Sequence, residues 1–192
     1  MHVKIGGVPE HFNYPWHYGI ENNFFKTKAL NLEWKDYPGG TGAMVEALKN
    51  KEIDLALLLT EGAIHAKIKG YPITLLQVYV ETPLQWGIYV AHEAMFTNVA
   101  ALQKQKIAIS RKGSGSHLMA AAHAQTQNWS INNLQYVVTN HIEETISALK
   151  KAEAAYFLWE VFTTSPYVES KILRCLDVFK APWPAFVLVA RR

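Results

Sequence analysis

Residues 47–57, ALKNKEIDLAL, and residues 148–158, ALKKAEAAYFL, share one pattern that decides how this chain is expected to fold. Each stretch starts in a helix, passes through a short polar turn and enters an apolar run. A short, nearly continuous apolar run is typical of a strand buried in a parallel sheet. Two interpretations stay open: a repeat of two similar lobes facing each other, or the general likeness of any two helix–strand units.

Strands and helices alternate outward from these stretches. Apolar spacing predicts strands at residues 3–8, 32–37, 54–59, 73–80, 87–91, 106–110, 134–138, 155–158 and 186–190. Helices are expected at 14–30, 43–51, 60–70, 118–127 and 142–151, with a helix or turn at 163–170. This alternation predicts an α/β fold with mostly parallel sheets, flanking helices and right-handed crossovers.

The composition bounds the function class. The chain has 192 residues, of which 49% are hydrophobic and 18% charged, a balance typical of globular domains. The net charge of +3 comes from scattered Lys and Arg residues, so we expect no nucleic-acid partner. Cys175 is the single cysteine and excludes an internal disulfide. No apolar run suggests a membrane span, and no His or Cys spacing suggests a metal site or cofactor.

Two glycine- and hydroxyl-rich loops each follow a strand and open a helix. They are residues 39–42, GGTG, and residues 113–116, GSGS. Free N–H groups and the positive end of a helix dipole meet at such a place, and glycine lets a ligand approach the backbone. We therefore take Gly40, Thr41, Ser114 and Ser116 as candidate ligand contacts. Ordinary helix capping is the other interpretation of both loops.

Further candidates come from strand ends, because ligands of open α/β sheets bind beyond the carboxyl ends of strands. Thr60 and Glu61 follow the strand at 54–59, Ser110 ends the strand at 106–110, and Trp159 and Glu160 end the strand at 155–158. Arg111 and Lys112 precede the second glycine loop, where they either pair with an anionic ligand or remain solvated.

The order of these segments resembles the type II periplasmic-binding-protein superfamily. The nearest likeness is the branch of nitrate, sulfonate, taurine and thiamine-precursor substrate-binding proteins of ABC transporters. The matching pieces are the opening strand with Asn13-Tyr14-Pro15, the loop GGTG with MVEAL, the stretch EIDLA, the loop at 110–116, the stretch YFLWE and the closing stretch PAFVLV. Their order, over nearly the whole chain, carries the resemblance.

The resemblance implies a two-lobed protein with lobe I at residues 1–91, lobe II at 92–184 and a returning strand at 185–192. In that family the ligand binds in an interlobe cleft that closes by a hinge, which adds Asn13 to the candidate contacts. The implied function is capture of a small polar or anionic molecule for ABC-type transport, without a catalytic step. An ABC permease is then an expected partner.

The chain departs from the family in two ways. The first strand starts directly after Met1 and His2 without a signal-like segment, so we expect a cytoplasmic protein as written, or a periplasmic one if a signal was removed. Family members continue past the returning strand with helices that cover lobe I, which this sequence does not include, so we expect apolar surface on lobe I that favours a homodimer.

Two other functions stay open on the same fold. One is an enzyme similar to pyrimidine-precursor synthases or menaquinone-pathway dehydratases, with Glu61, Glu160 and His117 as candidate acid–base groups. The other is the effector-binding domain of a transcription regulator.

Overall fold

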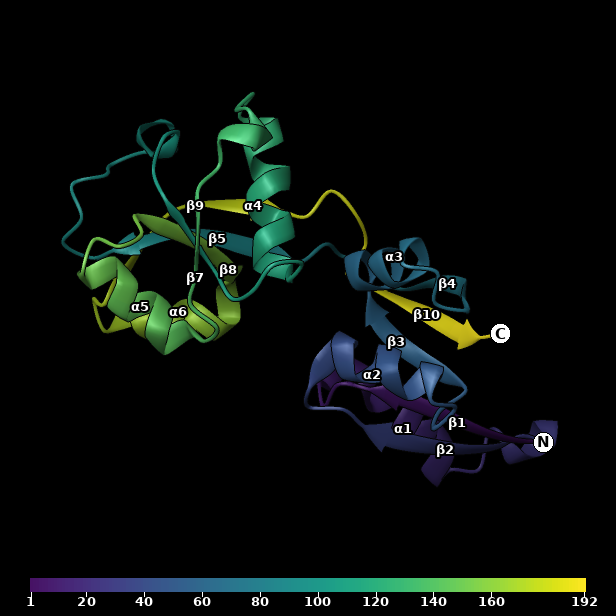
Figure 1. The fold of residues 1–192 in the computed structure, drawn as a ribbon. Helices are drawn as coiled ribbons and strands as arrows, with labels where there is room; N and C mark the ends of the chain where they lie inside the picture. The colour runs from purple at the N-terminus through teal and green to yellow at the C-terminus, as the bar shows by residue number, and fades with distance from the viewer. The chain divides into compact units, whose positions relative to one another are not determined.

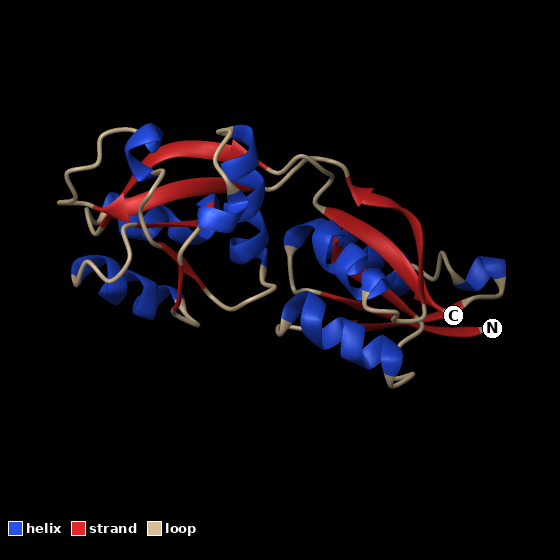
Figure 2. Cartoon of the chain, turned by 45° about the horizontal axis from the view of Figure 1, so that its top comes forward, coloured by secondary structure: helices blue, strands red, loops and turns tan.

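The computed structural model describes residues 1–192 and divides them into two compact units (Figure 1). The first unit combines Met1–Pro83 with Pro182–Arg192, and the second is Leu84–Ala181. Each unit holds one five-stranded sheet flanked by helices (Figure 2). None of the helices is both long and apolar enough to span a membrane.

The first unit is built from β1 (His2–Gly7), α1 (Tyr14–Glu21), β2 (Asn31–Asp36), α2 (Gly40–Lys49), β3 (Leu55–Leu59), α3 (Thr60–Ile68), β4 (Ile73–Val80) and β10 (Phe186–Arg191). Its strand order is β2-β1-β3-β10-β4. β1 pairs in parallel with β2 and β3, whereas β10 is antiparallel to both β3 and β4. All strands but β10 therefore run in one direction.

The second unit is built from β5 (Gln85–Ala91), β6 (Ile107–Ile109), α4 (Gly115–Thr126), β7 (Tyr136–Val138), α5 (Ile142–Lys150), β8 (Tyr156–Glu160), α6 (Val161–Glu169) and β9 (Leu173–Lys180). Its strand order is β7-β6-β8-β5-β9. β5 is antiparallel to β8 and β9, and β6 is parallel to β7 and β8. One reversed strand again interrupts an otherwise parallel set.

The two sheets share one topology. β1, β2, β3, β10 and β4 of the first unit occupy the same places as β6, β7, β8, β5 and β9 of the second. The registers correspond too, since Leu59 lies opposite Phe186 in the first sheet and Glu160 lies opposite Trp86 in the second. The likeness of residues 47–57 and 148–158 is therefore that of a repeated topology.

The central strands of each sheet are buried on both faces, which explains the apolar runs in the sequence. On β3, Ala56 and Leu58 pack with side chains of α2 and α3, whereas Leu57 packs with Trp16 and Ile20 of α1. In the second unit, α5 and α6 cover one face of the sheet together, and α4 packs on β6 and β8 (Figure 1). The helices thereby present their first turns at the carboxyl edge of each sheet.

The structure corrects several boundaries. The strand predicted at 87–91 as part of lobe I is β5 of the second sheet, and residues 182–184 belong to the first unit rather than to lobe II. Apolar periodicity identifies a strand but carries no information on which sheet receives it. The chain passes between units at Pro83–Leu84 and Ala181–Pro182.

Two elements also differ in extent. The helix predicted at 14–30 ends at Glu21, because Asn23 and Ala29 adopt positive φ angles of 59° and 56° that no helix continues through. The strand β9 was not predicted, since Arg174, Asp177 and Lys180 interrupt its apolar pattern. Charged residues of this kind are tolerated because β9 is an edge strand.

Asp54 joins three strands of the first sheet at its amino edge. Its Oδ1 accepts hydrogen bonds from Arg191 Nε at 3.0 Å and Nη2 at 2.7 Å, and its Oδ2 accepts from the Lys4 backbone N–H at 2.9 Å. The Lys4 amide and then the Arg191 guanidinium lower the pKa of Asp54 from its usual value.

We predict that Asp54→Asn destabilises the protein near pH 7 and that the difference disappears in acid. A carboxyl with a lowered folded-state pKa adds stability above its unfolded pKa of about 3.9, and that stability is lost as the pH falls through the folded value. We expect a loss of about 1 kcal/mol at pH 7, because the pair is partly solvated. Urea unfolding at pH 7 and pH 3 measures it, with exposed Glu52→Gln as control. An equal loss at both pH values contradicts the prediction.

Candidate functional site

Three serine hydroxyls of the second unit converge at the end of β6. Ser116 Oγ accepts a hydrogen bond from the Ser110 backbone N–H at 3.0 Å. The same oxygen lies 3.0 Å from Ser114 Oγ and 3.3 Å from Ser110 Oγ. All three residues are buried, with exposed fractions between 4% and 9%. The structure thus brings the three predicted serines into one cluster.

The cluster sits at the first turn of α4 because of local sequence. Gly113, with φ of 79°, turns the chain after β6, and Ser114 caps the helix by accepting from the His117 N–H at 3.4 Å. No protein group accepts from the N–H groups of Gly115 and Ser116. Free amides at the positive end of a helix dipole favour an anionic or polar ligand atom.

Positive charge beside the cluster comes from Arg111 and Lys112. Both side chains are exposed, and neither forms an ion pair. His117 adds none at neutral pH, because burial and then the charge of Lys112 lower the pKa of its imidazole. Its Nδ1 accepts from the Gly113 N–H at 3.0 Å, which places the ring proton on Nε2.

Sequence reasoning missed the end of β7, where Thr139 and Asn140 adjoin the cluster. The Asn140 N–H donates to the carbonyl of Ser110 at 3.0 Å, and Thr139 Oγ1 lies 2.6 Å from Thr145 Oγ1. The signal was present in residues 139–144, TNHIEE, where polar residues follow a strand and acidic residues open a helix. The short strand of three residues obscured it.

Trp159 and Glu160 lie at the end of β8, as predicted, but Glu160 is engaged locally. Its Oε1 accepts from the Phe162 N–H at 3.0 Å, and its Oε2 accepts from the Thr163 N–H at 2.9 Å and hydroxyl at 3.0 Å. Glu160 therefore caps α6. Trp159 is half-buried and packs edge-on against Phe157 with ring centroids 6.1 Å apart.

The corresponding edge of the first unit holds Gly40 and Thr41 in the first turn of α2. Gly40 has a φ of 68°, which favours glycine. Thr41 Oγ1 accepts from the Leu59 N–H at 3.1 Å, and the Thr41 methyl fills the space that a side chain on Gly62 would need. Thr41 thus ties the start of α2 to the start of α3.

Thr60 and Glu61 open α3 and meet the segment before β10. The Thr60 hydroxyl donates to the carbonyl of Pro184 at 2.5 Å, and Glu61 Oε2 accepts from Trp183 Nε1 at 3.0 Å. Sequence reasoning missed Trp183, because only the antiparallel pairing of β10 with β3 brings it to this edge. Burial raises the pKa of Glu61, and hydrogen bonds from its own backbone amide and then from Trp183 offset part of that rise.

We predict that Glu61→Gln stabilises the protein at neutral pH. A raised folded-state pKa means that the fold disfavours the ionised carboxylate, so the cost grows as the pH rises from the unfolded pKa through the folded one. Glutamine keeps an acceptor for Trp183 without the charge. Thermal unfolding should show a higher Tm for the variant at pH 7.5 and no difference at pH 4. The exposed Glu10→Gln is the control, and a lower Tm at pH 7.5 contradicts the prediction.

Asn13 ends the short 3-10 helix His11–Asn13 between β1 and α1, and one of its polar atoms has no partner. Its side chain is fully buried, and its Nδ2 donates to the carbonyl of Val8 at 2.7 Å. Its Oδ1 has no hydrogen-bond partner. A buried oxygen without a partner carries a desolvation cost that a ligand or water donor relieves. No three His, Cys, Asp or Glu side chains gather in either unit so as to hold a metal ion.

The predicted residues therefore divide into two sets, each at the carboxyl edge of one sheet. The first unit contributes Asn13, Gly40, Thr41, Thr60 and Glu61, and the second contributes Ser110, Ser114, Ser116, Trp159 and Glu160.

Comparison with known proteins shows that this chain has the periplasmic-binding-protein fold. A family model described as "Ca3427-like PBP" matches residues 86–178. The CA3427 gene product of Candida albicans, which exhibits the generic periplasmic-binding-protein fold, matches with a TM-score of 0.82 and 26% identity over 100% of this chain and 63% of its own. No curated protein matches the sequence.

Two sulfonate-binding proteins share the fold at lower identity. The periplasmic aliphatic sulphonate binding protein SsuA of Escherichia coli matches with a TM-score of 0.73 and 17% identity, over 100% of this chain and 65% of its own. The alkanesulfonate-binding protein SsuA of Xanthomonas axonopodis pv. citri, bound to MOPS, matches with a TM-score of 0.74, 17% identity and the same coverage. This chain thus spans less than two thirds of the length of all three proteins.

Proposed function

From its place in the type II periplasmic-binding-protein superfamily, we propose that this chain is a solute-binding protein for a small anionic or polar molecule. The candidate residues of both units are its proposed ligand contacts. The serine cluster carries the proposal, since it combines buried hydroxyls, two free helix amides and unpaired cations on one strand end.

The chemistry of the serine cluster favours a singly charged oxyanion. Its donors are neutral hydroxyls and amides, which bind the several oxygens of a sulfonate without neutralising them. The exposed Arg111 and Lys112 supply the opposing charge. The sulfonate-binding proteins with the same fold agree with this ligand class.

Glu61 is the proposed contact of the first unit for a positively charged group of the ligand. Its Oε2 accepts from Trp183 Nε1 at 3.0 Å, and the backbone amide of Glu61 itself also donates to the carboxylate. A buried carboxylate of this kind favours a donor, and an amine most of all. We therefore expect an aminosulfonate such as taurine to bind more tightly than an alkyl sulfonate of the same length.

Isothermal titration calorimetry and thermal-shift measurements test the proposal with taurine, ethanesulfonate, methylphosphonate, nitrate and acetate as probes. We expect sulfonates to bind, taurine to exceed ethanesulfonate, and Glu61→Gln to remove that difference. The absence of any binding in a folded sample would overturn the proposal. Incubation of bound ligand followed by mass spectrometry should return it unchanged, and conversion to a product would favour the enzyme alternative.

Delivery to an ABC permease and dimerisation belong to the same proposal. β4 is an edge strand of the first sheet and exposes Leu76 and Val78 by 52% and 49%. Exposed apolar edge strands pair readily with another chain.

We predict that Leu76→Lys combined with Val78→Lys lowers self-association of the purified protein by at least tenfold. Two added cations repel a second copy of the same edge. Light scattering after size-exclusion chromatography measures the dimer fraction. Gln103→Lys combined with Gln125→Lys, which adds the same charge at two exposed positions of the second unit, is the control. An unchanged dimer fraction in the variant of β4 contradicts the prediction.

A further inference from the structure

The second unit contains a cavity at the edge opposite the serine cluster. Its volume is about 660 Å³, within the range of small-molecule sites. The walls come from the end of β5, the end of α5, the turn before β8 and the start of β9. The residues that line the cavity include Ala91, His92, Met95, Phe96, Leu149, Lys150, Ala155 and Lys171. Neither the serines nor Glu160 touch it.

Comparison of the two units explains why the cavity exists. The pair Leu59–Phe186 of the first sheet corresponds to the pair Glu160–Trp86 of the second. Asp54 and Ala155 lie five positions before Leu59 and Glu160, and Arg191 and Ala91 lie five positions after Phe186 and Trp86. Asp54 therefore corresponds to Ala155, and Arg191 corresponds to Ala91. In the first unit this place is closed by the Asp54–Arg191 ion pair at 2.7 Å. In the second unit two alanines stand there, and both line the cavity.

One wall of the cavity is held in place by Arg174. Its Nη2 donates to the carbonyls of Ala94 at 2.7 Å and Phe96 at 2.8 Å, and the His92 N–H donates to the carbonyl of Ile172 at 3.0 Å. The loop that carries Met95 and Phe96 is therefore fixed before any ligand arrives. A preformed wall lowers the ordering cost of binding.

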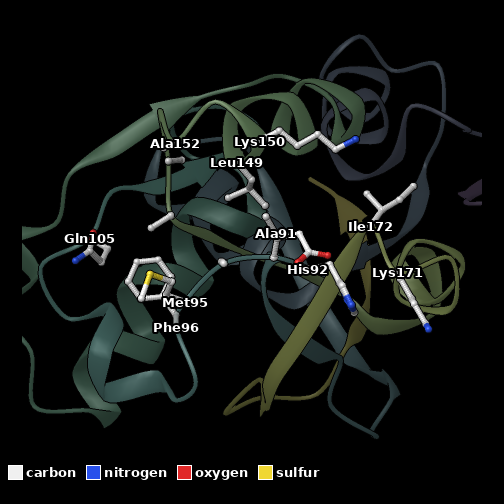
Figure 3. Close-up of a pocket in the computed structure, with 14 residues that line it drawn as sticks. Ala91, His92, Met95, Phe96, Gln105, Leu149, Lys150, Ala152, Lys171 and Ile172 are labelled. Carbon is white, nitrogen blue, oxygen red and sulfur yellow. The ribbon is translucent and has the colours of Figure 1, made fainter.

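The lining is apolar at one end and basic at the other. Figure 3 shows Met95, Phe96 and Gln105 on one side, and His92 and Lys171 on the other with the Lys150 amine. The Nδ1 atom of His92 is buried and has no hydrogen-bond partner. Neither lysine forms an ion pair, and the lining also includes Glu93.

The helix ends at the cavity do not supply a competing negative site. The last-turn carbonyls of α5 at Ser147, Ala148 and Leu149 accept from the chain that follows. Those of α6 at Pro166, Tyr167 and Val168 do the same. The charged side chains of the lining are therefore the amines of Lys150 and Lys171 and the single carboxylate of Glu93.

We propose that this cavity is a second ligand site, which takes a small carboxylic acid with an aromatic or branched apolar body. The body packs on Phe96 and Leu149, and the carboxylate lies near Lys150 and Lys171. One carboxylate oxygen accepts a hydrogen bond from His92 Nδ1. This site is independent of the solute proposed for the serine cluster.

Nuclear magnetic resonance titration of the whole chain with phenylacetate, and with its neutral isostere phenylacetamide, tests the proposal. We expect phenylacetate to bind at least fivefold more tightly and to shift the amides of His92, Met95 and Ile172. Equal affinities would overturn it, as would shifts confined to Ser114 and Ser116.

Variants locate the site. Ala155→Phe fills the cavity and should abolish phenylacetate binding, whereas Ala101→Phe, which lies outside the lining, should not. Lys171→Met should weaken binding about threefold to tenfold, and exposed Lys104→Met should leave it unchanged. If Ala155→Phe does not fold, the lysine pair decides. Unaltered binding by Lys171→Met would then overturn the proposal.

Discussion

Replacing Ser116 by alanine is expected to lower the free energy of unfolding of the second unit by about 1–3 kcal/mol and to weaken sulfonate binding by at least tenfold. Ser116 Oγ is the acceptor of the buried Ser110 N–H and the meeting point of three hydroxyls. Without it the Ser110 amide is buried and unpaired, and an unpaired buried donor costs its full desolvation free energy.

Denaturant unfolding and calorimetry measure the two effects. Ser130→Ala is the matched control, because Ser130 is an exposed serine of the same unit whose side chain makes no capping hydrogen bond. Phenylacetate binding should be the same in Ser116→Ala as in the unaltered protein. A variant that loses stability but keeps its full affinity for sulfonates would separate the cluster's structural role from ligand binding and contradict the proposed site.

The sequence predicted most strands and helices because the sheets are buried on both faces. β3 and β8 appear as short apolar runs, and the loops at Gly40 and Ser114 appear as glycine and hydroxyl residues after strands. These signals are local. The superfamily and its two-lobed α/β fold followed from their order, and the structural comparisons confirm them.

What the sequence did not predict depends on contacts between distant segments. Trp183 reaches Glu61 across 122 positions because β10 runs back along β3. β5 joins the second sheet rather than the first for the same reason, since strand pairing is decided by packing and not by periodicity. Thr139 and Asn140 follow a strand too short to stand out.

Some candidate residues form hydrogen bonds that stabilise helix starts, and residue type alone does not predict this role. Glu160 has both oxygens bound by the first turn of α6, and Thr41 holds the start of α3. The serine cluster combines its internal hydrogen bonds with helix amides at Gly115 and Ser116 that have no protein acceptor. The first turn of α2 also leaves the amides of Thr41 and Gly42 without an acceptor, so the convergence of three buried hydroxyls is what sets the cluster apart.

The largest loss of stability is expected from Gly87→Ala, about 3 kcal/mol in the second unit. Gly87 lies on β5, and a Cβ there would overlap the ring of Tyr89 two positions along the same strand. Tyr89 is only 2% exposed and packs against Phe157 with ring centroids 5.4 Å apart, so its ring has nowhere to move. In a close-packed interior the added methyl group forces neighbouring side chains or backbone to shift, and this strain destabilises the fold.

Gly7→Ala in the first unit is the matched control for Gly87→Ala. A Cβ on Gly7 would overlap Trp34, but that indole is only half-buried and can shift toward solvent, so we expect a loss of about 1 kcal/mol. Hydrogen exchange with peptide resolution should show that Gly87→Ala exposes β5, β8 and β9 while β1 and β3 stay protected, and the reverse for Gly7→Ala. Equal loss of protection in both units from either variant would mean that they unfold as one, and would contradict this prediction.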